Sequence, residues 1–194
     1  MVYLPQEVAY LVVNGRLGPS HLVTRKMAWI PPHAWQVLAD PEHGFLLWTP
    51  LAVFALGGLV VILRRHARIG VCLLAMVALQ VYVNGSISSW TVAGAFGHRR
   101  FVALTIVLVI GLVAWLSAWK TRRARAFALT VVAVAVWWNV ALMVQFGTGM
   151  MDRKRLELGT NAYNAFVRVP RELPHLAYRY LVDRKSFYAA PKAE

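Results

Sequence analysis

The residues best suited to chemistry lie in NGSISSWTVAGAFGHRRF, residues 84–101, between two long hydrophobic segments. His98, Arg99 and Arg100 directly precede the second segment, where a helix is expected to begin. Cations oppose the partial positive charge of a helix N-terminus, so helix stability does not explain these arginines. Helix N-termini attract anions, and the guanidinium fork matches phosphate oxygens. We therefore predict an anion site here; the alternative is contact between snorkelling side chains and lipid headgroups.

A second polar stretch, ADPEHGFLLWTP at residues 39–50, precedes another hydrophobic segment and carries Asp40, Glu42 and His43. Carboxylates near a helix N-terminus are favoured by about 0.3–1 kcal/mol, so capping is one explanation for them. The other is that a carboxylate and an imidazole transfer a proton, or hold a metal ion or a sugar hydroxyl. Trp90 of the first stretch has two corresponding explanations, an interfacial anchor or a ring that stacks on a sugar.

The composition indicates a membrane protein. Hydrophobic residues make up 59% of the 194 residues and charged residues only 15%, whereas soluble domains are about 45–50% apolar. The net charge of +13 is concentrated beside hydrophobic segments, which is typical of membrane-surface anchors rather than of nucleic-acid binding. The chain has no phosphate-binding glycine loop, CxxC, HExxH or GxSxG motif, and the single Cys72 allows no internal disulfide.

Four hydrophobic segments must position these residues. Each is predicted to be a transmembrane helix, because unpaired backbone groups are not tolerated in hydrocarbon. The fold class is therefore an all-α integral membrane protein, with the segments Phe45–Leu63, Ile69–Val83, Phe101–Trp119 and Ala126–Phe146.

The basic turns at residues 64–68 and 120–125 favour a cytoplasmic location by the positive-inside rule. Basic residues are equally numerous on the opposite side, so the first segment, which acidic residues precede and arginines follow, decides the orientation. We predict that both termini and the 84–100 loop lie outside. The chain then divides into an extracytoplasmic loop region (1–44), a four-helix transmembrane domain (45–146) and a basic amphipathic tail (147–194).

The tail is predicted to contain an amphipathic helix after Pro170 and Pro174. Its apolar residues at helical spacing, with basic residues beside them, suit a helix in the lipid headgroup plane. Packing on the protein's own loops is the alternative. The residues concerned are Leu173, Leu176, Ala177, Tyr180 and Leu181, accompanied by Arg179, Arg184 and Lys185.

Two motifs together resemble a known family. PEHGFLLWTPLAVFALGGL (41–59) and WTVAGAFGHRRF (90–101) resemble the C-terminal half of bacterial GT-C type membrane glycosyltransferases, similar to the dolichyl-phosphate-mannose mannosyltransferase group. NGRLGPS (14–20) and RKMAWIPPHAWQVL (25–38) resemble the loop before that half. The resemblance covers most of residues 14–146. It implies a multi-pass protein of the bacterial inner membrane that transfers a sugar from a polyprenyl-phosphate donor on the extracytoplasmic face.

The resemblance also implies roles for individual residues. Arg99 and Arg100 match the position of the lipid phosphate, His98 is expected to donate to it, and Trp90 and His43 are expected to bind substrate. The family's catalytic carboxylate acts as a base or holds a metal, and it lies in an N-terminal half that this chain lacks. The chain thus resembles a C-terminal fragment of a hexosyltransferase-like enzyme, with Asp40 and Glu42 as substitute bases and a divalent metal ion as the one cofactor left open.

Two alternatives belong to other functional classes. A non-catalytic membrane scaffold or subunit would bind a membrane protein partner instead of a sugar donor. A transporter would usually carry ionisable residues at mid-membrane, whereas these segments offer Gln80, Asn139 and Gln145. We expect these three residues to form hydrogen bonds between helices.

Overall fold

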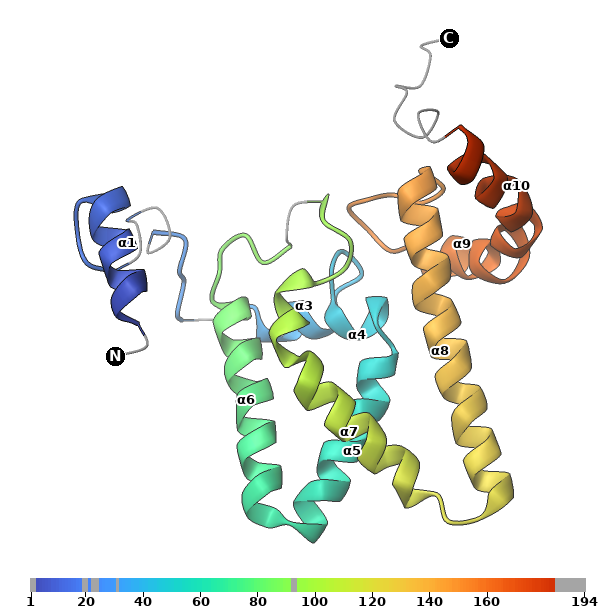
Figure 1. Ribbon diagram of the computed structural model, residues 1–194, viewed down its shortest axis with the longest axis horizontal. Coiled ribbons are helices and arrows are strands. Elements are labelled where there is room, and N and C mark those ends of the chain that lie inside the picture. The colour runs from blue at the N-terminus through green and yellow to red at the C-terminus, as the bar shows by residue number, and fades with distance from the viewer. Residues whose placement is uncertain (1–2, 19–20, 22–24, 31, 92–93, 184–194) are drawn as a thin grey trace.

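The computed structural model describes residues 3–18, 21, 25–30, 32–91 and 94–183, and within them every regular element is helical (Figure 1). Its only bridge between extended residues in this part of the chain joins Met27 and Ile87. The prediction of an all-α chain is confirmed for these residues. The helices are α1 (Leu4–Asn14), α3 (Ala34–Ala39), α4 (Phe45–Trp48), α5 (Leu51–Arg65), α6 (Ala67–Gly85), η2 (Arg99–Leu104), α7 (Thr105–Ala118), α8 (Arg122–Thr148), α9 (Leu158–Tyr163), η3 (Asn164–Arg168) and α10 (Val169–Val182).

Three helices among the described residues are long and apolar enough to cross a membrane: α6, the continuous helix formed by η2 and α7, and α8. Their most apolar windows are only 11–22% buried inside the protein. Large apolar side chains such as Ile106 and Met143 are therefore exposed, at 75% and 56%. Such surfaces suit a lipid environment, which supports the prediction of a membrane protein.

The first predicted segment, Phe45–Leu63, is not one helix. It breaks at Thr49, whose φ of −131° and ψ of 72° are not helical, because the following Pro50 disfavours helical geometry in the residue before it. The remaining α5 has 15 residues, or about 22 Å at 1.5 Å per residue, against roughly 30 Å of hydrocarbon. Four membrane crossings therefore stay a prediction.

The break leaves carbonyl groups of α4 without helical partners, and α8 supplies donors for them. Trp138 donates its indole N–H to the Leu47 carbonyl at 3.3 Å, and the Asn139 amide donates to the Trp48 carbonyl. Gln80 of α6 similarly donates to the Arg100 carbonyl at 2.9 Å. The prediction that Gln80, Asn139 and Gln145 form hydrogen bonds between helices is therefore confirmed for Gln80 of α6 and Asn139 of α8. The contacts of Gln145, described below, confirm it for the third residue.

Residues 1–44 contain more helix than the predicted loop. Pro5 lies in the first turn of α1, where its missing N–H is not needed, and Gly15 ends the helix at a φ of 68°. Backbone hydrogen bonds then attach the following chain to the end of α6: His33 N–H donates to the Gly85 carbonyl at 2.7 Å, and Ala28 N–H donates to the Ser86 carbonyl at 2.6 Å.

The closest helix pair is α5 and α7, which cross at two glycines. A Cβ atom at Gly58 would overlap the carbonyl oxygen of Gly111, and a Cβ at Gly111 would overlap the carbonyl oxygen of Ala55. The backbones thus touch directly, as small residues allow in membrane helices. Leu59 and Val107, 0% and 4% exposed, pack beside the crossing.

The two ends of the helical unit differ. In Figure 1 the turns between α5 and α6 and between α7 and α8 lie at the lower end, whereas α4 and residues 86–91 and 94–98 lie at the upper end. The basic turns are therefore at the opposite end from both polar stretches, as the predicted topology requires.

The crossing gives a direct test of the packing. Gly58→Ala should lower the free energy of unfolding by about 1–3 kcal/mol, since overpacking at a tight contact forces the backbones apart. Gly57→Ala is the matched control, because its Cβ would meet Trp115 at 3.6 Å, an ordinary contact. Thermal midpoints in detergent measure both; equal midpoints for the two variants would contradict this packing.

Candidate functional site

A cavity of about 320 Å³ lies between α5 and the helix formed by η2 and α7, directly under the 96–98 turn. Its walls are apolar except for four side chains. Those four are Thr49, His98, Arg99 and Thr105, and the rest of the lining is Phe45, Leu51, Ala52, Ala55, Phe96, Gly97, Phe101, Val102, Leu108, Val109 and Leu112.

The cavity follows from the helix crossing. Below it, α5 and α7 meet at Gly58 and Gly111 and leave no space. Above the crossing, small side chains of α5 at Ala52 and Ala55 face α7 across the gap. The turn that closes the top depends on Gly97, whose φ of 52° suits glycine; an added Cβ would meet the side chain of Trp48 at 3.7 Å.

The two adjacent arginines lie in different surroundings. Arg99 is exposed and lines the cavity. Arg100 is half-buried, does not line it, and donates from Nη2 to the Ser89 carbonyl at 3.2 Å. The predicted anion site at the arginine pair therefore reduces, at this cavity, to the single guanidinium of Arg99, while Arg100 holds the 86–98 loop.

His43 and His98 are brought together from the two polar stretches. His43 is 2% exposed, stacks on Trp48 at a centroid distance of 5.6 Å, and donates from Nε2 to the Ala95 carbonyl at 3.2 Å. His98 is 5% exposed and meets the Phe101 ring edge-to-face at 4.9 Å. The hydrogen bond between His43 and Ala95 joins the two loops above the cavity.

Burial sets the protonation of both imidazoles. Loss of solvation lowers the pKa of His43, against the opposing effects of the Ala95 carbonyl, Glu42 and Asp40. Loss of solvation, followed by the positive charge of Arg100 and the proximity of His43, lowers the pKa of His98 to about 4. Both rings are therefore neutral at pH 7.

His98 does not present a donor to the cavity. Both of its ring nitrogens are enclosed and lack a hydrogen-bond partner of good geometry; the nearby backbone of Trp90 and of His98 itself only weakly favours the charged form. The expected donation from His98 to a phosphate therefore has no support in this arrangement. Its ring fills the cavity roof.

The carboxylates lie outside the cavity. Asp40 follows α3 and accepts the Glu42 N–H through Oδ1 at 2.8 Å, while Glu42 is exposed. Neither forms a side-chain cap hydrogen bond with α4, whose N-cap residue is Gly44. The described residues contain no group of three His, Cys, Asp or Glu side chains that could hold a metal ion. The residues do not fit the divalent ion that the resemblance left open.

Trp90 also lies away from the cavity. It is half-buried, packs against the core around Val37 and Phe45, and its ring lies 6.1 Å from that of His33. A sugar-binding role for Trp90 would therefore need a site other than this cavity.

Sequence reasoning did not identify the cavity walls. Thr49 and Thr105 carry no motif, and the apolar walls looked like ordinary membrane-facing residues. The available signals were the Thr-Pro break and a stripe along one helix: Phe101, Thr105, Leu108 and Leu112 recur every three or four residues.

Comparisons of the chain with family models, curated proteins and solved structures found no match. The resemblance of residues 41–59 and 90–101 to membrane glycosyltransferases stays a prediction. Function must be inferred from the cavity and its surroundings.

The buried imidazoles predict that the protein loses stability in mild acid. The pKa of His98 in the folded chain, about 4, lies below its ordinary value of 6.5. The unfolded chain therefore binds more protons between these values, and unfolding becomes easier as the pH falls, by at most about 1.4 kcal/mol per pH unit for one group. Thermal midpoints of the wild type should fall from pH 7 to pH 4.5.

His98→Gln removes one of the two imidazoles and should flatten this pH dependence without abolishing it, because His43 still titrates. The comparison uses the slope against pH, so a constant loss of stability in the variant does not affect it. An unchanged slope would exclude His98 as a source of acid sensitivity.

Proposed function

We propose that this protein binds a polyprenyl-phosphate-linked sugar donor and acts in glycosyl transfer at the extracytoplasmic face of a bacterial inner membrane, as a membrane protein of the GT-C glycosyltransferase type. The observation that carries the proposal is the cavity of about 320 Å³, apolar along α5 and α7 and bordered at its upper end by Arg99. A ligand with a hydrocarbon chain and an anionic head matches an apolar cavity that ends at a guanidinium group.

The apolar part of the cavity suits the lipid chain. Its walls belong to the helix of residues 99–118, which is long and apolar enough to cross a membrane. A lipid hydrocarbon chain that enters between Val102 and Val109, which both line the cavity, moves from the apolar bilayer into an apolar cavity. Dispersion contacts with the walls, rather than the hydrophobic effect, would then hold it in place.

The charged end suits a phosphate. Arg99 forms no ion pair with a carboxylate of the described residues, so its guanidinium is available for an external anion. Arginine binds phosphate through parallel hydrogen bonds, and a hydrogen bond to a charged group contributes about 1.5–3 kcal/mol. Thr49 and Thr105 add hydroxyl groups to the same lining.

This arrangement suits one part of glycosyl transfer. When an acceptor hydroxyl attacks the anomeric carbon, the bond from that carbon to the phosphate oxygen breaks and the lipid phosphate leaves with the electron pair. Arg99 would stabilise the negative charge that develops on this leaving group. No carboxylate lines the cavity, so the base that accepts the hydroxyl proton would come from outside it.

Photo-crosslinking with a polyprenyl-phosphate probe tests the proposal. Arg99→Ala should reduce specific labelling of the purified chain by about 10- to 100-fold, the equivalent of one lost charge-assisted hydrogen bond. Arg100→Ala should reduce it much less, because that side chain faces Ser89 and not the cavity. Equal labelling of the wild type and the Arg99→Ala variant would refute the site.

Two controls separate charge from packing. Arg122→Ala removes an exposed arginine at the far end of the helical unit and should leave labelling unchanged. Ala55→Phe fills the apolar part of the cavity and should block the lipid chain while Arg99 is retained. An uncharged polyprenol should compete poorly with the probe.

A second candidate is a non-catalytic lipid-binding subunit that acts with a membrane protein partner. The absence of a carboxylate from the cavity lining favours it. Incubating the chain with a polyprenyl-phosphate-linked sugar and candidate acceptors separates the two: donor binding without release of the sugar supports the subunit. Release of the sugar that depends on Asp40 or Glu42 supports the enzyme.

A further inference from the structure

The C-terminal helices have a buried face and a separate exposed apolar face. From α9 through η3 to α10, the buried residues follow one side, with exposures of 0–8%. Ala165 and Val169 on this side pack against α8 and Met150. The buried members are Asn161, Asn164, Ala165, Val169 and Leu176. Of the apolar residues that the sequence grouped into one amphipathic stripe, Leu176 thus belongs to the protein interior.

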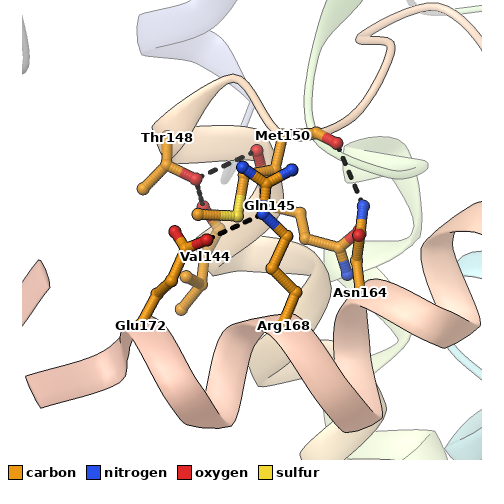
Figure 2. A network of polar contacts seen from close by, with 7 residues as sticks. All are labelled: Val144, Gln145, Thr148, Met150, Asn164, Arg168 and Glu172. Carbon is orange, nitrogen blue, oxygen red and sulfur yellow. Dashed lines mark hydrogen bonds and ion pairs between the residues drawn. The ribbon is translucent and has the colours of Figure 1, made fainter.

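Polar contacts fix this orientation on the end of α8. Asn161 donates to Gln145 Oε1 at 3.0 Å, and Gln145 donates back to the Asn161 carbonyl at 3.2 Å. Figure 2 shows the next contact, from the Asn164 amide to the Met150 carbonyl at 3.2 Å. Trp137 also donates to the Ala165 carbonyl at 3.0 Å. Because buried hydrogen bonds are directional, α9 and η3 cannot rotate about their axis without breaking them, and α10 continues directly from η3.

A second face of these helices is apolar and exposed. Its large residues are separated by three, seven and eight positions, which places them on one side of a helix. They are Tyr163, Phe166, Leu173 and Leu181, exposed by 59%, 51%, 40% and 81%. We call this set the outer apolar face.

A basic edge lies on another side of the helix from the outer apolar face, because Arg168 is two positions from Phe166 and Arg171 two from Leu173. Arg168, Arg171 and His175 are exposed and follow each other at intervals of three and four residues. Arg168 also pairs with Glu172 at 2.7 Å, as Figure 2 shows. Arg171 follows Arg168 by three residues, which is one turn of the helix. An apolar face with arginines on a separate polar side is the pattern of helices that lie at an anionic membrane surface.

The outer apolar face is continuous with the lipid-facing surface of the helices. Phe166 closes one end of an apolar groove of about 390 Å³ between α5 and α8, whose other walls include Phe54, Val134 and Trp138. The α8 wall of this groove belongs to a helix of membrane-spanning length. The outer apolar face therefore joins the apolar surface of α8 at Phe166.

We propose that the outer apolar face lies in the interfacial region of the lipid bilayer, with the basic edge in contact with anionic headgroups. A water-exposed face would leave four large apolar side chains uncovered beside a membrane helix. A bilayer covers them with the surface that already surrounds α8. The inference is independent of the cavity and of the proposed function.

Spin labels on the full chain in nanodiscs test this placement. In a Cys72→Ser background, single cysteines replace Phe166, Leu173 or Leu181 on the outer apolar face and Arg171 or His175 on the basic edge. The first three labels should collide several-fold more with oxygen, which concentrates in lipid, and less with an aqueous nickel chelate. Met76→Cys on α6, where Met76 is 45% exposed, is the lipid-facing reference.

Each alternative gives a different result. Labels at the outer apolar face that collide with the nickel chelate as often as those at Arg171 would overturn the proposal in favour of water. Labels protected from both reagents would overturn it in favour of a protein partner. Replacing anionic lipid by zwitterionic lipid, or Arg171→Gln alone, should move the Leu173 and Leu181 labels toward water. Arg122→Gln, at the other end of α8, should not.

Discussion

The contact between the backbones of α5 and α7 determines the rest of the arrangement. Since Gly58 and Gly111 bring the two helices together at one point, the helices must diverge away from it. The cavity occupies the divergent side and is roofed by the 96–98 turn. A larger residue at the crossing would change the depth and width of the cavity, although neither glycine touches a ligand. The site thus depends on a contact remote from its charged end.

The charge at the cavity depends on which of the neighbouring histidine and arginine side chains are buried. Burial lowers the pKa of both His43 and His98, the proximity of His43 lowers that of His98 further, and both rings are neutral at pH 7. The half-buried Arg100 is directed into the 86–98 loop. Arg99 is left as the cation at the cavity. A neutral roof beside one exposed guanidinium gives a local positive potential that neighbouring acidic groups do not cancel.

The sequence predicted the helical class and the approximate positions of α6, α7 and α8. Hydrophobic runs of membrane length specify those helices strongly. The break at Thr49 was visible as a Thr-Pro pair but was hidden inside a continuous apolar run. Hydropathy also could not show that Arg99 and Arg100 face different surroundings, because side-chain direction depends on the η2 turn. The burial of Leu176, one of the apolar residues at helical spacing in the tail, could not be predicted. It follows from the contact between Gln145 and Asn161 of α9, which are distant in sequence.

The hydrogen bonds from Trp138 and Asn139 to the carbonyls of α4 have an evolutionary consequence. They exist because Pro50 interrupts the first helix and frees those carbonyls. In a relative without this proline and with a straight helix, Trp138 and Asn139 would lose their hydrogen-bond acceptors. Position 50 and position 139 should therefore change together across relatives, so that the kink and the amide are inherited as one unit.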